Sequence, residues 1–415
     1  MAFGNLVGAR KYVNKVFDVE AALGGLTDGR TSPTVPFASV MVTWFWSLTR
    51  RSPSTEQVGD LLRNARWQKQ IGLKPGDGGS ADTAARVLDE LNIEELNEVH
   101  LDAFFAARRA GILKDDGPYG KRLAIVDLNE LFKSEKIHCD KCQVREKKVK
   151  DAQDNEQIVN EYYHQAVALV WGGELTWPIG WELLAPGEGE LTAALRLLAR
   201  LLPRLAHSLD GVMGDALYCC RPFFKMVCAQ GLDAYAISSG VTEMDSEIEL
   251  LMKTEAPVKM PGPPVDAWAF ESEAWQPELQ RKLRIAHYVR RYPEKPWKHE
   301  RQTLRLVTSA PVSILPLGQG WKVGRFRWRI ENGTFNILTR DYALEHNYRH
   351  STPAIVALLV LRSLAYCFTM AYRRFATARS KNAPRFILWF QSVFVDDWVR
   401  YLDGLHSATA DPLSG

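Results

Sequence analysis

The segment from 122 to 239 constrains the fold more than any other part of the chain. It predicts three strands, over 122–132, 162–173 and 174–187, and then a helix over 190–208. A strand, a helix and a further strand follow. The strands are short apolar runs between glycine-containing turns, whereas the helix repeats its apolar residues about every 3.6 positions. Hairpin strands followed by alternating helices and strands indicate the α/β (mixed) class, with helices packed on a mixed sheet.

The regions on either side of this segment predict further domains. Residues 1–115 have helical apolar spacing and end at a glycine- and proline-containing turn, whereas 243–315 are irregular and rich in Pro and Trp. A chain of 415 residues is long enough for two or three domains. We therefore expect an N-terminal helical domain at 1–115, a core at 116–242 and 316–415, and a β-rich insertion domain at 243–315.

An apolar run at 353–372 is long enough to cross a membrane. Arg362 lies at its middle, where a bilayer would impose a cost of about 2.5–3.5 kcal/mol. We predict a buried core helix with Ser351 or Thr352 as its N-cap. The N-terminus lacks the pattern of a secretory signal, and the six cysteines suit a reducing compartment. We expect a cytoplasmic protein with no membrane partner.

Three acids are candidates for catalytic or metal-binding roles. Asp127 lies inside an apolar strand, where an unpaired carboxylate is costly. Asp215 ends a later strand, and Glu331 follows Arg327 by one helical turn. Each has an ordinary alternative: a solvent-facing strand end or an arginine pair for Asp127, a helix cap for Asp215, and a surface ion pair with Arg327 for Glu331. Together they could hold hard cations such as Mg²⁺, and two ions about 3.5–4 Å apart would support phosphoryl transfer.

Basic residues form local clusters although the net charge is only +3. Such clusters predict a polyanion-binding face, and an ordinary solvated surface is the alternative for any one of them. The candidate polyanion-binding residues lie around Glu331 and in the insertion: Arg325, Arg327, Arg329 and Arg340, together with Arg290, Arg291 and Lys298.

The stretch HCDKC has the C-x2-C spacing of zinc sites, with His138, Cys139 and Cys142 as candidate ligands. A second close pair of ligands is missing, and His164 is only a candidate for the fourth position. Ordinary packing is the simpler alternative. Tryptophans of the insertion, such as Trp268, could stack on a flipped base, and packing within a small β domain is again the simpler alternative.

Several of these blocks together resemble the DDE transposases of bacterial insertion sequences, which have a ribonuclease-H-like catalytic core. AIVDLNELF resembles the strand of their first Asp, VMGDALYCC the block of the second Asp, and RFRWRIENGTFNILTR the block of the Glu. The long gap between the second Asp and the Glu is where a subset of these enzymes carries a β-rich insertion.

This resemblance implies a DNA transposase that cuts transposon ends and joins them to target DNA. Asp127, Asp215 and Glu331 would be both catalytic residues and ligands of two Mg²⁺ ions, with Asp127 bridging them and Mn²⁺ as a substitute. The implied partners are double-stranded DNA of the transposon ends and the target, and a second copy of the chain in a homodimer. The implied location is the bacterial cytoplasm, in association with the nucleoid.

The chain departs from one signature of this family, Tyr-x2-Arg-x3-Glu-x6-Lys. Arg327 and Glu331 fit it, but Gly324 stands at the Tyr position and Leu338 at the Lys position, and Arg340 is a candidate substitute for the lysine. Two alternatives therefore stay open. One is a structure-specific ribonuclease-H-like nuclease or resolvase, and the other is an inactive transposase derivative that only binds DNA.

Overall fold

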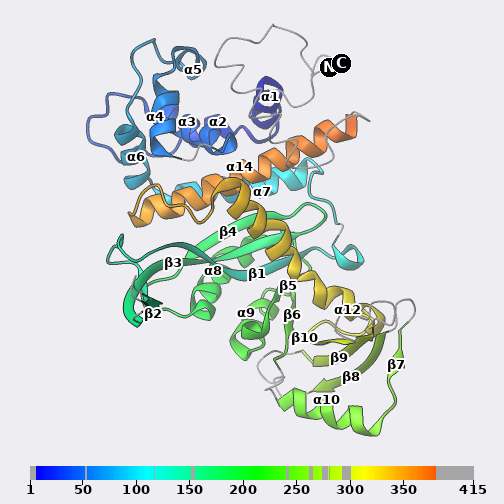
Figure 1. The fold of residues 1–415 in the computed structure, drawn as a ribbon. Helices are drawn as coiled ribbons and strands as arrows, with labels where there is room; N and C mark the ends of the chain where they lie inside the picture. The colour runs from blue at the N-terminus through cyan, green and yellow to red at the C-terminus, as the bar shows by residue number, and fades with distance from the viewer. Residues whose placement is uncertain are drawn as a thin grey trace.

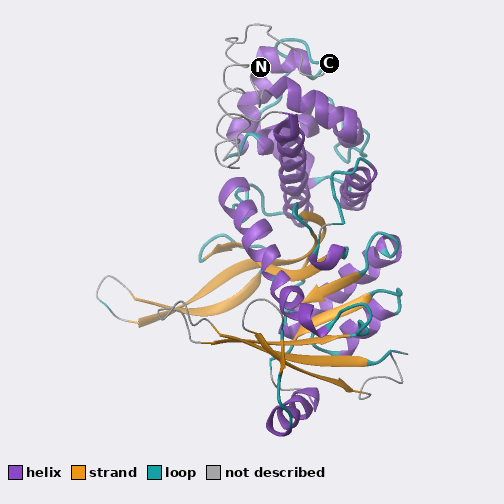
Figure 2. Ribbon diagram, turned by 90° about the vertical axis from the view of Figure 1, so that its right-hand side faces the viewer, coloured by secondary structure: helices purple, strands orange, loops and turns teal. Residues whose placement is uncertain are grey.

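The computed structural model describes residues 6–51, 54–115, 117–150, 154, 156–239, 243–260, 265–272, 279, 281–291 and 301–379. Figure 1 shows a layer of helices at one end, a twisted sheet in the middle and a group of strands at the other end. Helices lie on both sides of the sheet (Figure 2), so the mixed α/β class expected from the sequence is confirmed.

The first helices of the chain form the helical layer. Ser80 begins one of them with a reciprocal capping box to Thr83, and Asn92 caps another by accepting from the backbone of Glu94 and Glu95. Such caps satisfy backbone donors that have no partner inside the helix. The helices are α1 (Leu6–Phe17), α2 (Val19–Gly24), α3 (Phe37–Thr49), α4 (Thr55–Arg63), α5 (Ala65–Gln70), α6 (Ala81–Asp89) and α7 (Ile93–Arg109).

The ten strands found among the described residues form one sheet. Its order is β2-β3-β1-β5-β6-β10-β9-β8-β7, and β4 pairs with β3 beside this path. The pairs β1–β5 and β5–β6 are parallel, whereas β1–β3 and β10–β6 are antiparallel. The strands are β1 (Leu123–Ser134), β2 (Gln143–Lys150), β3 (Glu156–Gly172), β4 (Trp177–Leu183), β5 (Gly211–Gly214), β6 (Asp233–Ile237), β7 (Val258–Lys259), β8 (Val265–Ser272), β9 (Leu283–Arg291) and β10 (Arg301–Thr308).

The strands expected to belong to a separate insertion lobe continue the core sheet. β10 pairs with β6 through Leu306↔Ile237, Val307↔Ala236 and Thr308↔Tyr235, and β9, β8 and β7 follow outward. The backbone N–H and C=O groups along the edge of β6 need hydrogen-bond partners, and β10 provides those partners. With α10 (Glu243–Thr254), this region extends one sheet and has no separate sheet of its own in the part that the structure describes.

Helices α8 (Glu190–Leu205) and α9 (Arg221–Cys228) pack on the core strands. The buried residues of α8 recur at three- and four-residue spacing, as in Ala194, Leu197, Leu198 and Leu201, which gives the helix one apolar face.

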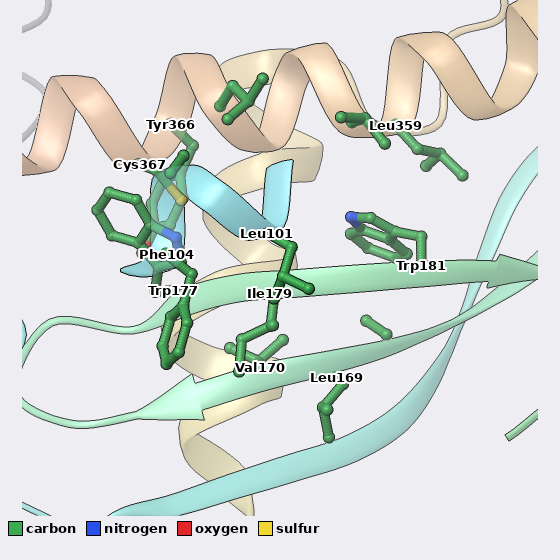
Figure 3. Packing of buried hydrophobic residues seen from close by; sticks show 14 of the residues in the cluster. Leu101, Phe104, Leu169, Val170, Trp177, Ile179, Trp181, Leu359, Tyr366 and Cys367 are labelled. Carbon is green, nitrogen blue, oxygen red and sulfur yellow. The ribbon is translucent and has the colours of Figure 1, made fainter. Parts of the chain in front are cut away.

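The long helix α14 (Thr352–Arg379) joins the helical layer to the sheet. It packs against α3, α6 and α7 as well as β4. Figure 3 shows Leu359, Tyr366 and Cys367 of α14 near Trp177 and Trp181 of β4. It is the one helix of the described residues that is long and apolar enough to cross a bilayer, and 89% of its apolar segment is buried inside the protein.

Arg362 shows why this helix is a core helix, as the sequence predicted. Its side chain is buried at 2% exposure and donates to the carbonyl oxygens of Leu344 and His346, at 3.1 and 2.5 Å. It also lies over the ring of Tyr348, 5.1 Å from the centroid. Two nitrogens of the buried guanidinium thus find acceptors within the protein. Ser351 caps the helix by accepting from the backbone N–H of Ala354.

A second helical rod crosses the sheet just before α14. It comprises α12 (Leu317–Phe326), a π-helical segment η3 (Ile330–Phe335) and α13 (Asn336–Tyr342). A Cβ at Gly324 would lie 2.3 Å from Leu304 of β10, so α12 contacts this strand directly. A side chain at this position would require Leu304 to move.

Candidate active site

Asp127 lies on the central strand of the core, as the sequence predicted. β1 pairs with β3 on one side, where Asp127 stands opposite Ala168, and with β5 on the other side. The described pairing with β5 ends at Ile125↔Met213, two residues before Asp127. Asp127 is therefore the last residue of the fully buried part of β1, and it lies beyond the last residue of β1 that pairs with β5.

Asp215 directly follows Gly214, the last residue of β5. Since β1 and β5 are parallel, both acids lie at carboxyl ends of neighbouring strands, where α/β sheets collect ligands. One oxygen of Asp215, Oδ1, accepts from the backbone N–H of Leu217 at 2.8 Å and caps the short helix η2 (Ala216–Tyr218). The capping alternative raised for this residue is thus real, and it occupies one of the two carboxylate oxygens.

Glu331 reaches the same place from the helical rod. It lies on the π-helical segment, a local widening that often marks functional sites. Nη1 of Arg327 donates to Oε1 of Glu331 at 2.6 Å and lies 3.4 Å from Oδ2 of Asp127. Both distances are measured from the same nitrogen. The separation between Oε1 of Glu331 and Oδ2 of Asp127 therefore cannot exceed the sum of the two distances. The ion pair of Glu331 with Arg327 is therefore also a link to Asp127.

The electrostatics show that all three acids interact. The pKa of Asp127 is raised to about 7 as the net result of several effects: burial raises it most, the Arg327 guanidinium lowers it, and the negative charges of Asp215 and Glu331 raise it. The structure thus brings together the three acids that the sequence singled out. A group of carboxylates that includes one buried acid with a raised pKa, here Asp127, is typical of functional sites.

The charge balance of this cluster fits a divalent cation. Within the described residues, the ion pairs of Asp127 and Glu331 both go to the same side chain, Arg327. One guanidinium leaves most of the negative charge of three carboxylates uncompensated in a site where Asp127 has only 12% of its side chain exposed. Carboxylate oxygens are the ligands that Mg²⁺ prefers, so the donor set suits this ion.

A fourth acid, Glu190, was missed by the sequence reasoning. It stands at the first position of α8, where Tyr218 donates to its Oε1 at 2.8 Å. Burial raises the pKa of Glu190, the hydrogen bond from Tyr218 lowers it, and the charge of Asp215 raises it. An acid in the first turn of a helix usually serves the helix dipole, so the sequence carried no signal that this carboxylate lies beside the cluster.

The basic residues around Glu331 have different environments. Arg325 lies over the Trp328 ring at 4.6 Å and donates to Gln302, whereas Arg329 is exposed. Arg340 makes two hydrogen bonds with Asp341, at 3.0 and 2.8 Å, while 55% of its side chain stays exposed.

The candidates of the insertion are less informative. Arg290 is half-buried in β9, and the backbone of Arg291 pairs with Arg301 of β10. Lys298 lies outside the described residues. Other cations of this region serve the fold: Arg281 pairs with Asp233, and Arg305 pairs with Asp245 and Glu249.

The candidate zinc ligands lie elsewhere. Cys139 and Cys142 are adjacent to His164, whereas the ring of His138 stacks on Tyr162 with centroids 4.3 Å apart. In the insertion, the indole N–H of Trp268 donates to the carbonyl oxygen of Glu255 at 3.0 Å.

Comparison with known proteins gives little to add to this geometry. No protein-family model matches the chain, and no curated protein matches it in sequence. Among solved structures, the piggyBac transposase synaptic complex with hairpin DNA matches at a TM-score of 0.45 and 11% identity, covering 99% of this chain and 87% of that chain. A similarity this low assigns neither a fold nor an activity, and the function proposed below depends on the site itself.

Proposed function

We propose that this protein is a DNA transposase that cuts transposon ends and joins them to target DNA by two-metal phosphoryl transfer. The observation that supports the proposal is the grouping of three acids: Asp127 and Glu331 share the guanidinium of Arg327, and the charge of Asp215 acts on Asp127. Carboxylates gathered at the carboxyl ends of parallel strands, with so little compensating charge, are suited to hold cations and not to stabilise the fold.

Asp127 is the residue best placed to be shared between two Mg²⁺ ions, because its charge interacts with both other acids. Asp215 keeps Oδ2 for an ion while Oδ1 caps η2, and Glu331 has 42% of its side chain exposed toward incoming ligands. When bound, such ions make water more acidic and stabilise charge on the attacking and leaving oxygens of a phosphodiester.

The rest of the chemistry belongs to side chains of this protein. The Arg327 guanidinium pairs with Asp127 and Glu331 and, once cations bind these acids, would be free to hold a phosphate oxygen. Arg329 and Arg340 present exposed positive charge on the same rod and suit the DNA backbone. Arg325 is oriented by the Trp328 ring and by its hydrogen bond to Gln302.

The proposal extends to the partners. Transposition joins two ends, so we expect two copies of the chain to act together on double-stranded DNA. Residues 1–115 would serve DNA binding and assembly, and the strands from 243 to 315 would extend the DNA-binding face.

The test is cleavage of labelled duplexes that contain the ends of the element encoding this chain. Purified protein with Mg²⁺ or Mn²⁺ should nick the duplex at the end and join the freed 3′-hydroxyl to a target plasmid, whereas Ca²⁺ should support binding alone. Cleavage of branched DNA without joining would favour the nuclease or resolvase alternative. Binding without any cleavage in either metal would favour the inactive derivative.

Arg327→Ala separates a phosphate contact from a structural ion pair. With Ca²⁺ at the acids, loss of one phosphate contact should weaken binding to end DNA and lower the slope of log affinity against log salt by about 0.9. Without divalent ions the guanidinium is engaged by Asp127 and Glu331, so the variant should bind DNA nearly as well as the wild type.

The measurement is a salt titration of DNA affinity with and without Ca²⁺, and Arg329→Ala is the comparison because its side chain is exposed in either case. Unchanged affinity of Arg327→Ala at every salt concentration with Ca²⁺ would leave Arg327 as a counter-ion of the acids only.

A further inference from the structure

A second group of ligand-type side chains lies apart from the three acids. It consists of Cys139 and Cys142 in the connection from β1 to β2, His164 on β3 and His350 in the segment between α13 and α14. Their ligand atoms all lie within 4.8 Å of one another. We propose that these four residues bind one Zn²⁺ ion in a closed structural site.

The distances fit a tetrahedral zinc ion. Cys139 Sγ lies 3.7 Å from Cys142 Sγ, and His164 Nε2 lies 3.7 and 3.4 Å from these two sulfurs. With Zn–S near 2.3 Å and Zn–N near 2.0–2.1 Å, a tetrahedral site places its sulfurs about 3.8 Å apart and each sulfur about 3.6 Å from a nitrogen. The three side chains therefore already have the spacing that the ion requires.

The turn between the two cysteines directs both thiols to the same side. The backbone N–H of Cys139 donates to Cys142 Sγ at 3.3 Å, and the N–H of Cys142 donates to the carbonyl oxygen of Cys139 at 3.2 Å. Both sulfurs therefore lie beside Nε2 of His164.

His350 supplies an independent reason for a ligand. Both of its ring nitrogens are buried, and neither has a hydrogen-bond partner among the described residues. A buried polar atom left without a partner costs about 1–3 kcal/mol. A metal ion at this place would engage one ring nitrogen of His350, and it would engage the buried ring of His164 through Nε2, the nitrogen that lies beside the two sulfurs.

The ligand set differs from the one that the sequence suggested. His138 stacks on Tyr162, and its Nδ1 lies 3.3 Å from the carbonyl oxygen of Lys136. His350 takes its place, although it lies far away in sequence. Its ring meets Phe132 of β1 edge-on, with centroids 4.7 Å apart, so packing holds it beside the cysteines.

Four protein ligands leave no open position, which is typical of structural zinc. The ion would join three segments: the β1–β2 connection, β3, and the segment that links α13 to α14. Those segments adjoin the strand of Asp127 and the helical rod of Glu331, so zinc would fix one relative to the other. His164 lies four residues from Ala168, the partner of Asp127 in the register, or roughly 13 Å along the strand. The site is thus separate from the acids, and its presence does not depend on the proposed function.

The experiment measures metal in the full chain, produced with zinc and purified without chelator. Elemental analysis should find one zinc per chain in the wild type and in His138→Ala, the matched control. Cys142→Ser and His350→Ala should lose it. Because these variants could fail to fold, the wild type is also depleted and titrated with Co²⁺. One equivalent should produce tetrahedral d–d absorption and the charge-transfer bands of thiolate ligands.

Thermal unfolding separates this site from the acids. A zinc-selective chelator in excess Mg²⁺ should lower Tm of the wild type, and it should have no effect on Cys142→Ser. Wild-type protein without zinc, with an intact mass two hydrogens lower from a Cys139–Cys142 disulfide, would overturn the proposal. Full zinc retention by His350→Ala would overturn the four-ligand set.

Discussion

Asp127→Asn, Asp215→Asn and Glu331→Gln should each abolish metal-dependent cleavage of end DNA while leaving DNA binding nearly intact. Each change keeps the shape of the side chain but removes the charge that attracts a divalent ion. Loss of a residue that merely orients a metal ligand typically costs 10–100-fold, so loss of a ligand should cost more than about 100-fold. Binding should persist because it comes from basic residues such as Arg329, and a lost negative charge beside phosphate would if anything strengthen it.

Glu130→Gln is the matched control for this series. Glu130 lies three residues after Asp127 on the same strand, but its carboxylate pairs with Arg145 at 2.7 Å, away from the other acids. The measurement is the single-turnover rate of nicking with saturating protein and Mg²⁺, together with DNA affinity in Ca²⁺. Wild-type cleavage by any one of the three variants would remove that residue from the catalytic set. Loss of cleavage in Glu130→Gln would mean that the assay responds to damage to the fold of β1 and not to loss of a metal ligand.

The three acids could be singled out from the sequence because each has an unusual local setting. Asp127 interrupts an apolar strand, Asp215 follows another, and Glu331 is one acid among arginines. Glu190 is an ordinary residue for the first turn of a helix, so only the fold shows that it lies near Asp215. His350 was missed for a similar reason, because a zinc site assembled from distant segments has no spacing to recognise.

The elements with buried faces were predicted well, and the exposed ones were not. The strand at 122–132 and the helix at 190–208 correspond to β1 and α8, since apolar runs and helical periodicity indicate burial. β2 was missed because its sequence, QVREKKVK, is charged and almost entirely exposed, and it is a strand because β3 offers its edge. The sequence also could not predict that β10 pairs with β6, because the choice of a strand's partner depends on the tertiary structure.

Asp127→Asn should stabilise the metal-free protein at high pH. The pKa of Asp127 is raised to about 7 in the folded protein, chiefly by burial, against about 3.9 in an unfolded chain. Between these values the folded protein holds a proton that the unfolded chain has released. The stability of the metal-free wild type therefore falls as pH rises through this window, and above pH 7 the full cost of the buried charge is present. Asparagine has no such cost.

The expected gain at pH 8 is about 2–4 kcal/mol, because each unit of pKa shift corresponds to about 1.4 kcal/mol, and it should vanish near pH 4. Mg²⁺ should raise Tm of the wild type at pH 8 and have little effect on the variant, since a ligand stabilises only the state that binds it. Thermal unfolding of both proteins at the two pH values, with and without Mg²⁺, measures all of this. If Asp127→Asn were instead less stable at pH 8, the pairing of Asp127 with Arg327 would be a structural salt bridge, because removing one partner of such a pair leaves a buried charge uncompensated. The acids would then serve the fold, and the case for a metal at this place would be lost.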